Sequence, residues 1–304
     1  MLSKSIQAPF TIFYAIDSQV KENLSRVLTA FRRHRVGTQH FASVSGYGHD
    51  DLGRETLDHV FADVVGAAAA AVRIQLMSGT HAIACALYGV LRPGDELLAV
   101  AGSPYDTLEE VIGLRGQGQG SLREFGVTYR ELPLTPQHTL DWAALATAVR
   151  PETRMVLIQR SCGYSWRRSL TIADIERIVT LVKQQNPDTV CFVDNCYGEF
   201  VETREPTAVG VDLMAGSLIK NPGGTIAPTG GYLAGRTDLV DAALCRLSAP
   251  GIGRAGGATL DQSRLLYQGL FLAPQMVGEA LKANVLIAQT FAQLGYPVSP
   301  AADA

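Results

Sequence analysis

Lys220 is the residue of this sequence best placed to act as a nucleophilic amine. Among the five lysines, it alone comes at the end of an apolar run and before a turn, Asn221-Pro-Gly-Gly. Its neighbours are small or apolar, which favours a lowered pKa and a neutral, reactive amine. Most isolated loop lysines are ordinary surface residues, so this interpretation depends on the side chains around Lys220.

Asp194 and Tyr105 also follow apolar runs. Asp194 closes the run 190–194, where an aspartate either caps a helix or faces a cationic ring nitrogen, and the sequence favours neither. Tyr105 follows the run 96–100, so it either stacks on a flat cofactor or packs within a loop. Both residues fit a cofactor that combines a positive ring nitrogen with a planar face.

A group of small hydroxyl residues suggests a phosphate site. Ser78, Gly79 and Thr80 open a predicted helix, where free backbone N–H groups and two hydroxyls suit an anion. Plain helix capping by Ser78 or Thr80 is the alternative. Ser217, three residues before Lys220, adds a further hydroxyl.

These residues are positioned by a predicted α/β fold. Short apolar runs alternate with amphipathic stretches, which predicts a mostly parallel seven-stranded sheet with helices on both faces. In such sheets ligands bind at the carboxyl ends of the strands. The predicted strands are 72–77, 96–100, 127–132, 155–159, 190–194, 213–217 and 231–234, and the predicted helices are 16–35, one capped by Asp51, 80–90, 107–114, 140–149, 172–185, 238–246 and 275–294.

Composition argues against several classes of protein. The net charge of -3 and the 18% of charged residues give no basic surface for nucleic acid beyond residues 32–35. No uninterrupted apolar run reaches the ~18 residues of a membrane span, and the first residues lack a signal-peptide pattern. Five widely spaced cysteines and six unclustered histidines predict a cytoplasmic protein with reduced thiols and no metal site.

The segment 251–256 matches the pattern G-x-G-x-x-G. It follows a predicted helix and a proline, whereas a dinucleotide site needs a preceding strand. We therefore interpret it as a loop, and NAD binding remains a third, weaker hypothesis.

Taken in order, these parts match the needs of pyridoxal 5'-phosphate (PLP): phosphate, ring face, ring nitrogen and aldehyde. The sequence resembles the aluminium-resistance or methionine gamma-lyase-like family of PLP-dependent cysteine and methionine metabolism enzymes. Six segments carry the resemblance: GYGHDDLGR (46–54), MSGTHA (77–82), GSPYDTLE (102–109), IQRSCGY (158–164), FVDNCYGEFV (192–201) and AGSLIKNPGG (215–224).

The resemblance implies a fold-type I PLP-dependent transferase-like fold and a role for each matching residue. Lys220 would form the Schiff base and Asp194 would pair with the ring nitrogen. Tyr105 would stack on the ring as a second catalytic residue. The phosphate would be held by Ser78, Gly79, Thr80 and Ser217, Ser161 or Arg160 would lie near the ring hydroxyl or the phosphate, and Tyr47 and Arg54 would reach the phosphate of a neighbouring subunit in a homodimer or homotetramer.

The expected domains are an N-terminal helical segment and inter-subunit arm (1–65), a large PLP-binding domain (66–272), and a linking helix that begins a truncated C-terminal small domain (273–304). Two positions depart from the family pattern: His49 replaces an expected aromatic residue, and Thr225 an expected glycine.

The implied activity is a carbon–sulfur lyase that acts on a cystathionine- or methionine-type amino acid by β- or γ-elimination. Because the small domain usually supplies an arginine for the substrate carboxylate, the alternative is a non-catalytic PLP-binding remnant or scaffold.

Overall fold

The computed structural model describes residues 2–302 of the 304-residue chain, and its side chains from residue 11 onward. A seven-stranded sheet lies at its centre, in the order β1-β7-β6-β5-β4-β2-β3. The pairs β1–β7 and β7–β6 are antiparallel, and the other four neighbouring pairs are parallel. The predicted mostly parallel, seven-stranded α/β fold is confirmed.

The strands are β1 (Ala69–Arg73), β2 (Glu96–Ala99), β3 (Thr128–Glu131), β4 (Thr153–Gln159), β5 (Val190–Asp194), β6 (Leu213–Ser217) and β7 (Gly231–Gly235). Strands β2, β5, β6 and β7 are buried along their whole length. Burial on both faces explains why these strands are continuous apolar runs rather than alternating ones.

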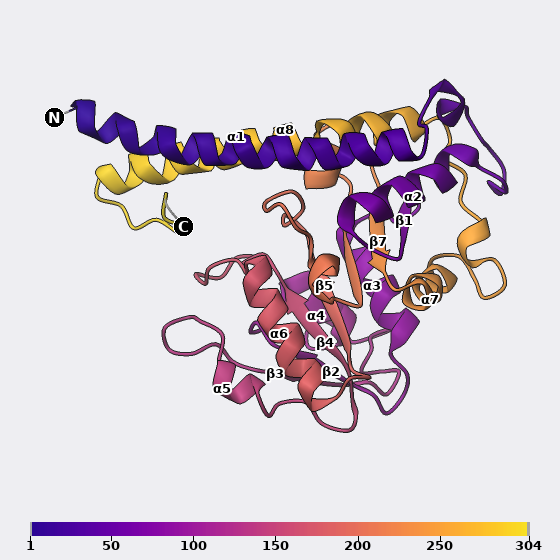
Figure 1. The fold of residues 1–304 in the computed structure, drawn as a ribbon. Helices are drawn as coiled ribbons and strands as arrows, with labels where there is room; N and C mark the ends of the chain where they lie inside the picture. Colours follow the sequence, from indigo (N-terminus) through magenta and orange to yellow (C-terminus); the bar gives the residue numbers. More distant parts are fainter. Residues whose placement is uncertain (1, 303–304) are drawn as a thin grey trace.

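The helices are α1 (Leu2–Arg33), α2 (Leu52–Val65), α3 (Gly79–Val90), α4 (Asp106–Ile112), α5 (Trp142–Leu145), α6 (Ile172–Gln185), α7 (Thr237–Leu247) and α8 (Ser263–Gln293), with 3-10 turns η1 (Thr38–Phe41), η2 (Pro206–Val209), η3 (Asn221–Gly223) and η4 (Gly253–Ala255). One core cluster joins one face of the sheet to α2, α6 and α8, and a second joins the other face to α3, α4 and α7. Helices therefore cover both faces, as predicted (Figure 1).

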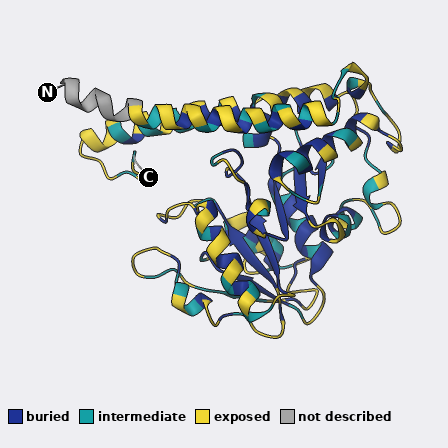
Figure 2. Ribbon diagram, in the orientation of Figure 1, coloured by how far each residue is buried: buried dark blue, intermediate teal, exposed yellow. Residues whose placement is uncertain are grey.

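The two long helices α1 and α8 lie side by side and extend well beyond the sheet (Figure 1). Their outer surfaces are largely exposed (Figure 2). By length and composition α8 is apolar enough to cross a membrane, but core helices of soluble proteins pass the same test. The packing of α8 against α1 and η3 buries part of its apolar surface, including Leu270, Ala273 and Val277, while Phe271, Leu286, Ile287 and Phe291 stay exposed.

Several predicted boundaries were wrong. The first strand spans Ala69–Arg73 rather than 72–77, since the following apolar residues form a turn that still buries Leu76. The helix predicted over 140–149 is the single turn Trp142–Leu145, continued by a turn at residues 146–147. Helix α1 starts at Leu2 rather than at residue 16, and α8 starts at Ser263 rather than at residue 275.

Candidate active site

The carboxyl ends of the parallel strands bring most of the predicted site residues to one edge of the sheet. Strands β5 and β6 pair with Asp194 opposite Ala215. Ser217 ends β6, and Lys220 lies in the turn beyond it, where its backbone N–H donates to the Ser217 carbonyl. The lysine and the aspartate therefore leave neighbouring strands on the same side.

Asp194 is 2% exposed, and its Oδ1 accepts a hydrogen bond from the Cys196 backbone N–H at 3.0 Å. Burial raises the pKa of Asp194 more than this hydrogen bond and the Lys220 charge lower it. Without a cofactor, Asp194 therefore does not have the lowered pKa of a carboxyl that faces a ring cation. A buried carboxyl of this kind becomes a stable anion when a cation is placed against it.

Lys220 is half-buried, and its Nζ lies 4.0 Å from the centroid of the Tyr197 ring. Burial lowers the pKa of the Lys220 ammonium, but electrostatic interactions with the neighbouring Cys196, Tyr197 and Asp194 outweigh it, so that the pKa is raised. The lowered pKa predicted from small neighbours was wrong for this reason: the acidic and polar groups come from β5 and the loop after it, not from residues adjacent to Lys220 in sequence.

The predicted phosphate loop forms the start of α3. The Ser78 Oγ accepts from the His81 backbone N–H at 3.0 Å, so the capping alternative is correct for Ser78. Its hydroxyl hydrogen remains available to a ligand, as do first-turn N–H groups that have no acceptor within the helix. A Cβ on Gly79 would lie 2.9 Å from the Cys196 Sγ and 3.2 Å from the Ser217 Cβ, which places this helix start directly against β6.

Tyr105 lies beside the same helix start. Its hydroxyl is 3.1 Å from the Thr80 Oγ1, and its backbone N–H donates to the Gln159 Oε1 at 3.2 Å. Burial and the Asp194 charge raise the pKa of Tyr105, so its phenol stays protonated. Sequence reasoning missed Gln159, whose side chain also donates to the Ser161 carbonyl at 3.2 Å and thereby joins Tyr105 to the loop after β4.

Arg160 does not reach the site, although the sequence offered it as an alternative to Ser161. Its guanidinium donates to the Asn195 Oδ1 at 2.9 Å, the Gly198 carbonyl at 2.7 Å and the Glu202 Oε1 at 2.9 Å. The neighbouring Glu205 lies 3.7 Å away. Through these contacts, the Arg160 guanidinium stabilises the loop after β5.

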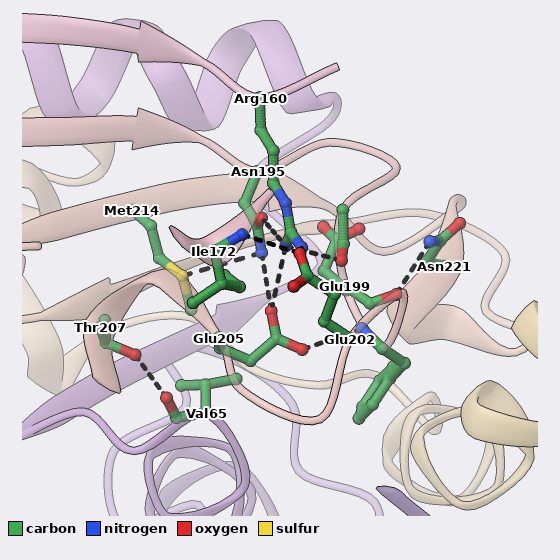
Figure 3. Close-up of polar contacts among 12 residues, drawn as sticks. Val65, Arg160, Ile172, Asn195, Glu199, Glu202, Glu205, Thr207, Met214 and Asn221 are labelled. Atoms are coloured by element: carbon green, nitrogen blue, oxygen red, sulfur yellow. Dashed lines mark hydrogen bonds and ion pairs between the residues drawn. The ribbon is translucent and has the colours of Figure 1, made fainter. Parts of the chain in front are cut away.

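Figure 3 shows this network, with Asn195 and Glu205 near its centre. Glu199 belongs to it: its Oε1 accepts from the Tyr232 hydroxyl at 2.7 Å, while its Oε2 is buried without a hydrogen-bond partner. Burial raises the pKa of Glu199 to about 8, so that this carboxyl is largely protonated at neutral pH. Nothing in the sequence pattern indicated that this glutamate is buried.

Tyr47 and Arg54 lie apart from Lys220 in the described chain. Tyr47 is exposed, and Arg54 is buried, donating to the Gly48 carbonyl at 2.6 Å and the Gly257 carbonyl at 3.0 Å. Arg54 thus holds two loops of its own chain together. The adjacent Asp51 caps α2, as predicted, and also accepts from the Thr259 hydroxyl at 2.7 Å.

Two sequence departures have distinct structural settings. Thr225 has a φ of 67°, in the left-handed region that favours glycine, which explains why a glycine was expected there. His49 packs beside Tyr47, with ring centroids 5.9 Å apart.

The segment 251–256 forms the turn η4 after α7. It does not join a strand to a helix, so it lacks the strand–loop–helix context that a dinucleotide-binding site requires.

The cysteines and acids suggest no second chemistry. All five cysteines are free, with Cys85, Cys191 and Cys196 buried. Among the described residues, no group of three or more His, Cys, Asp or Glu side chains could hold a metal ion.

The whole sequence, residues 1–304, matches the family model for methionine gamma-lyase. The chain belongs to the methionine gamma-lyase family. Protein YnbB of Bacillus subtilis (strain 168), a relative, is 50% identical over 294 residues, which cover 95% of this chain and 70% of that protein.

Solved structures agree with this assignment. A carbon–sulfur lyase involved in aluminium resistance from Clostridium novyi NT is 45% identical, with a TM-score of 0.95, and the match covers 99% of this chain and 72% of that one. The pyridoxal-5'-phosphate-dependent protein YhfS from Escherichia coli shares the fold at 19% identity, with a TM-score of 0.66, over 91% of this chain and 70% of that one. The predicted family and the fold-type I architecture of PLP-dependent enzymes are therefore confirmed.

Proposed function

We propose that the protein binds PLP at Lys220 and acts as a carbon–sulfur lyase on an amino acid of the cystathionine or methionine type. One observation carries this proposal. A lysine amine and a fully buried aspartate leave neighbouring parallel strands beside a helix start that bears hydroxyl groups. Family membership supports the same chemistry.

The donor set fits the cofactor from end to end. Asp194 lacks a full counter-charge in the protein alone, which suits a protonated ring nitrogen. The first turn of α3, with Ser78 and Thr80, supplies N–H and O–H donors for a phosphate, and Ser217 lies close to it. Tyr105 offers an aromatic face next to Thr80. We propose Ser161 as a further donor, because Gln159 joins its backbone to that of Tyr105.

PLP, when bound, supplies an electron sink for the bonds at the substrate Cα. Lys220 would take the Cα proton once its amine is free, and deliver protons within the site. Asp194 would keep the ring nitrogen protonated, and the neutral Tyr105 phenol could donate a hydrogen bond to a departing group. Elimination would expel a thiol.

The assembly is part of the proposal. Tyr47 is exposed beside a groove of about 630 Å³ lined by loop residues such as Ile252 and Leu260, a surface suited to a second copy of the chain. We propose a homodimer or homotetramer in which Tyr47, and Arg54 through the loops that it holds, complete the neighbouring site. We also propose that the protein is cytoplasmic and that a small-molecule amino acid is its only ligand besides PLP. The proposed domains are the N-terminal arm (1–65), the large PLP-binding domain (66–272) and the start of the small domain (273–304).

The test compares the wild type with Lys220→Ala and with Lys21→Ala, an exposed lysine on α1. With PLP added, the wild type and Lys21→Ala should show the visible absorbance band of a lysine-bound cofactor, and Lys220→Ala should not. Release of pyruvate or 2-oxobutanoate from cystathionine or methionine then separates a lyase from a non-catalytic PLP-binding scaffold. An unchanged band in Lys220→Ala would refute the site.

A further inference from the structure

Tyr197 has a side chain that packing alone does not explain. The residue is 59% exposed, and the Lys220 Nζ lies 4.0 Å from the ring centroid. That distance is well within the ~6 Å over which an ammonium is attracted to the face of an aromatic ring. The Tyr197 ring therefore lies against the Lys220 amine, at the centre of the candidate site.

The backbone at Tyr197 is strained. Its φ is 67°, in the left-handed region that L-residues other than glycine, asparagine and aspartate seldom adopt. Phe200 in the same loop has a similar φ of 61°, but its ring is buried, being 2% exposed, so apolar packing offsets the strain. Tyr197 has no comparable burial, and strain of this kind gathers at functional sites.

The loop around Tyr197 is held firmly enough to maintain this conformation. The Cys196 backbone N–H donates to Asp194 at 3.0 Å, and the Gly198 backbone N–H donates to the Asn195 carbonyl at 2.8 Å. Arg160 donates to the Gly198 carbonyl at 2.7 Å. The backbone on both sides of Tyr197 is therefore held by hydrogen bonds.

We propose that Tyr197 is a positioning residue for Lys220, whose protonated amine it holds against the face of its ring. The ring favours the protonated amine over the neutral amine, because a cation is attracted by the ring quadrupole. A role of this contact in catalysis rests on the proposed function. The contact between Lys220 and the Tyr197 ring does not depend on it.

Other groups near Lys220 act on the same charge and set the controls. Asp194 and Cys196 face it from β5 and the following loop, and the Tyr197 side chain carries a polar hydroxyl as well as the ring. The turn η3, which directly follows Lys220, packs on α8 next to uncharged residues such as Leu266 and Leu270. Phenylalanine at position 197 keeps the ring and removes the hydroxyl, so it separates these contributions.

The experiment measures the pKa of Lys220 in the cofactor-free protein, by competitive acetylation across pH and mass spectrometry of the peptides, with Lys21 as an internal reference. The variants are Tyr197→Phe, Tyr197→Leu and Tyr197→Asn. Asparagine tolerates left-handed backbone, so it preserves the fold if leucine does not.

Tyr197→Phe should leave the pKa of Lys220 within about 0.3 units of the wild type, and the two non-aromatic variants should lower it by roughly 0.5 to 1 unit. An unchanged pKa in Tyr197→Asn would overturn the proposal. So would an equal fall in Tyr197→Phe, which would assign the effect to the hydroxyl. Because no PLP is present, this outcome is independent of whether Lys220 binds the cofactor.

Discussion

Replacing Glu199 by glutamine should stabilise the protein, and more so as the pH rises. Glu199 is 1% exposed, and its carboxyl accepts one hydrogen bond from another side chain, the Tyr232 hydroxyl, so that a negative charge on it is poorly compensated. Glutamine has the same shape and can accept the same hydrogen bond, but it carries no charge at any pH. The pH-dependent part of the difference therefore isolates the cost of ionising this side chain, because the cost of burying the glutamine amide N–H groups is the same at every pH.

The size of the effect follows from the pKa of Glu199, which burial raises from 4.5 to about 8. Between these values the folded protein holds a proton that the unfolded chain has released, so stability falls as the pH rises through this window. At 1.36 kcal/mol per unit, the cost is about 1 kcal/mol at pH 5 and about 4 kcal/mol at pH 8, with a ceiling near 5 kcal/mol. Glu199→Gln should recover these amounts.

Urea unfolding of the wild type and Glu199→Gln at pH 5, 6, 7 and 8 measures the difference directly. Buried acids that are not coupled to Glu199, such as Glu96 on β2, affect both proteins and cancel in the comparison, whereas the repulsion from Glu205 contributes to the raised pKa of Glu199 and is part of the measured difference. Glu22→Gln, on the exposed face of α1, is the matched control and should change stability by less than ~0.5 kcal/mol at every pH. A gain that does not grow with pH, or a loss throughout, would refute the assignment of a protonated, buried Glu199.

Three further predictions follow from local geometry. Gly79→Ala should weaken PLP binding roughly tenfold in a spectroscopic titration, because its Cβ would lie 2.9 Å from the Cys196 Sγ; unchanged affinity would contradict the close contact. Thr225→Gly should raise the free energy of unfolding by about 0.5–1 kcal/mol, since it relieves a left-handed, exposed threonine; a loss would show that the threonine has a role of its own. Arg160→Met should lower that free energy by about 3–5 kcal/mol in urea unfolding, because it leaves the buried Glu205 with less counter-charge; an effect below 1 kcal/mol would contradict the network.

The sequence predicted the architecture well because parallel strands buried on both faces leave long apolar runs. It also predicted the positions of Asp194 and Lys220, since the ends of such runs mark the edge where ligands bind. It failed at residues 72–77, where burial of Leu76 in a turn imitates a strand. A linear apolar pattern does not distinguish these two causes of burial.

The electrostatics of the site were harder to predict. The pKa of Lys220 depends on groups that lie 23 to 26 residues away in sequence, such as Tyr197 and Asp194. Arg160 and Glu199 lie within the motifs that carry the family resemblance, yet their side chains turn into a buried network. A motif fixes which residues are near the site, but the backbone conformation decides which of them face it.

The central claim is that Lys220 is the lysine that holds PLP. The most direct test is to reduce the PLP-loaded protein with borohydride, digest it, and locate the pyridoxyl group by mass spectrometry. We expect the label on Lys220, within the peptide that contains Asn221-Pro-Gly-Gly. A label on another lysine, or PLP bound without any reducible attachment, would contradict the account.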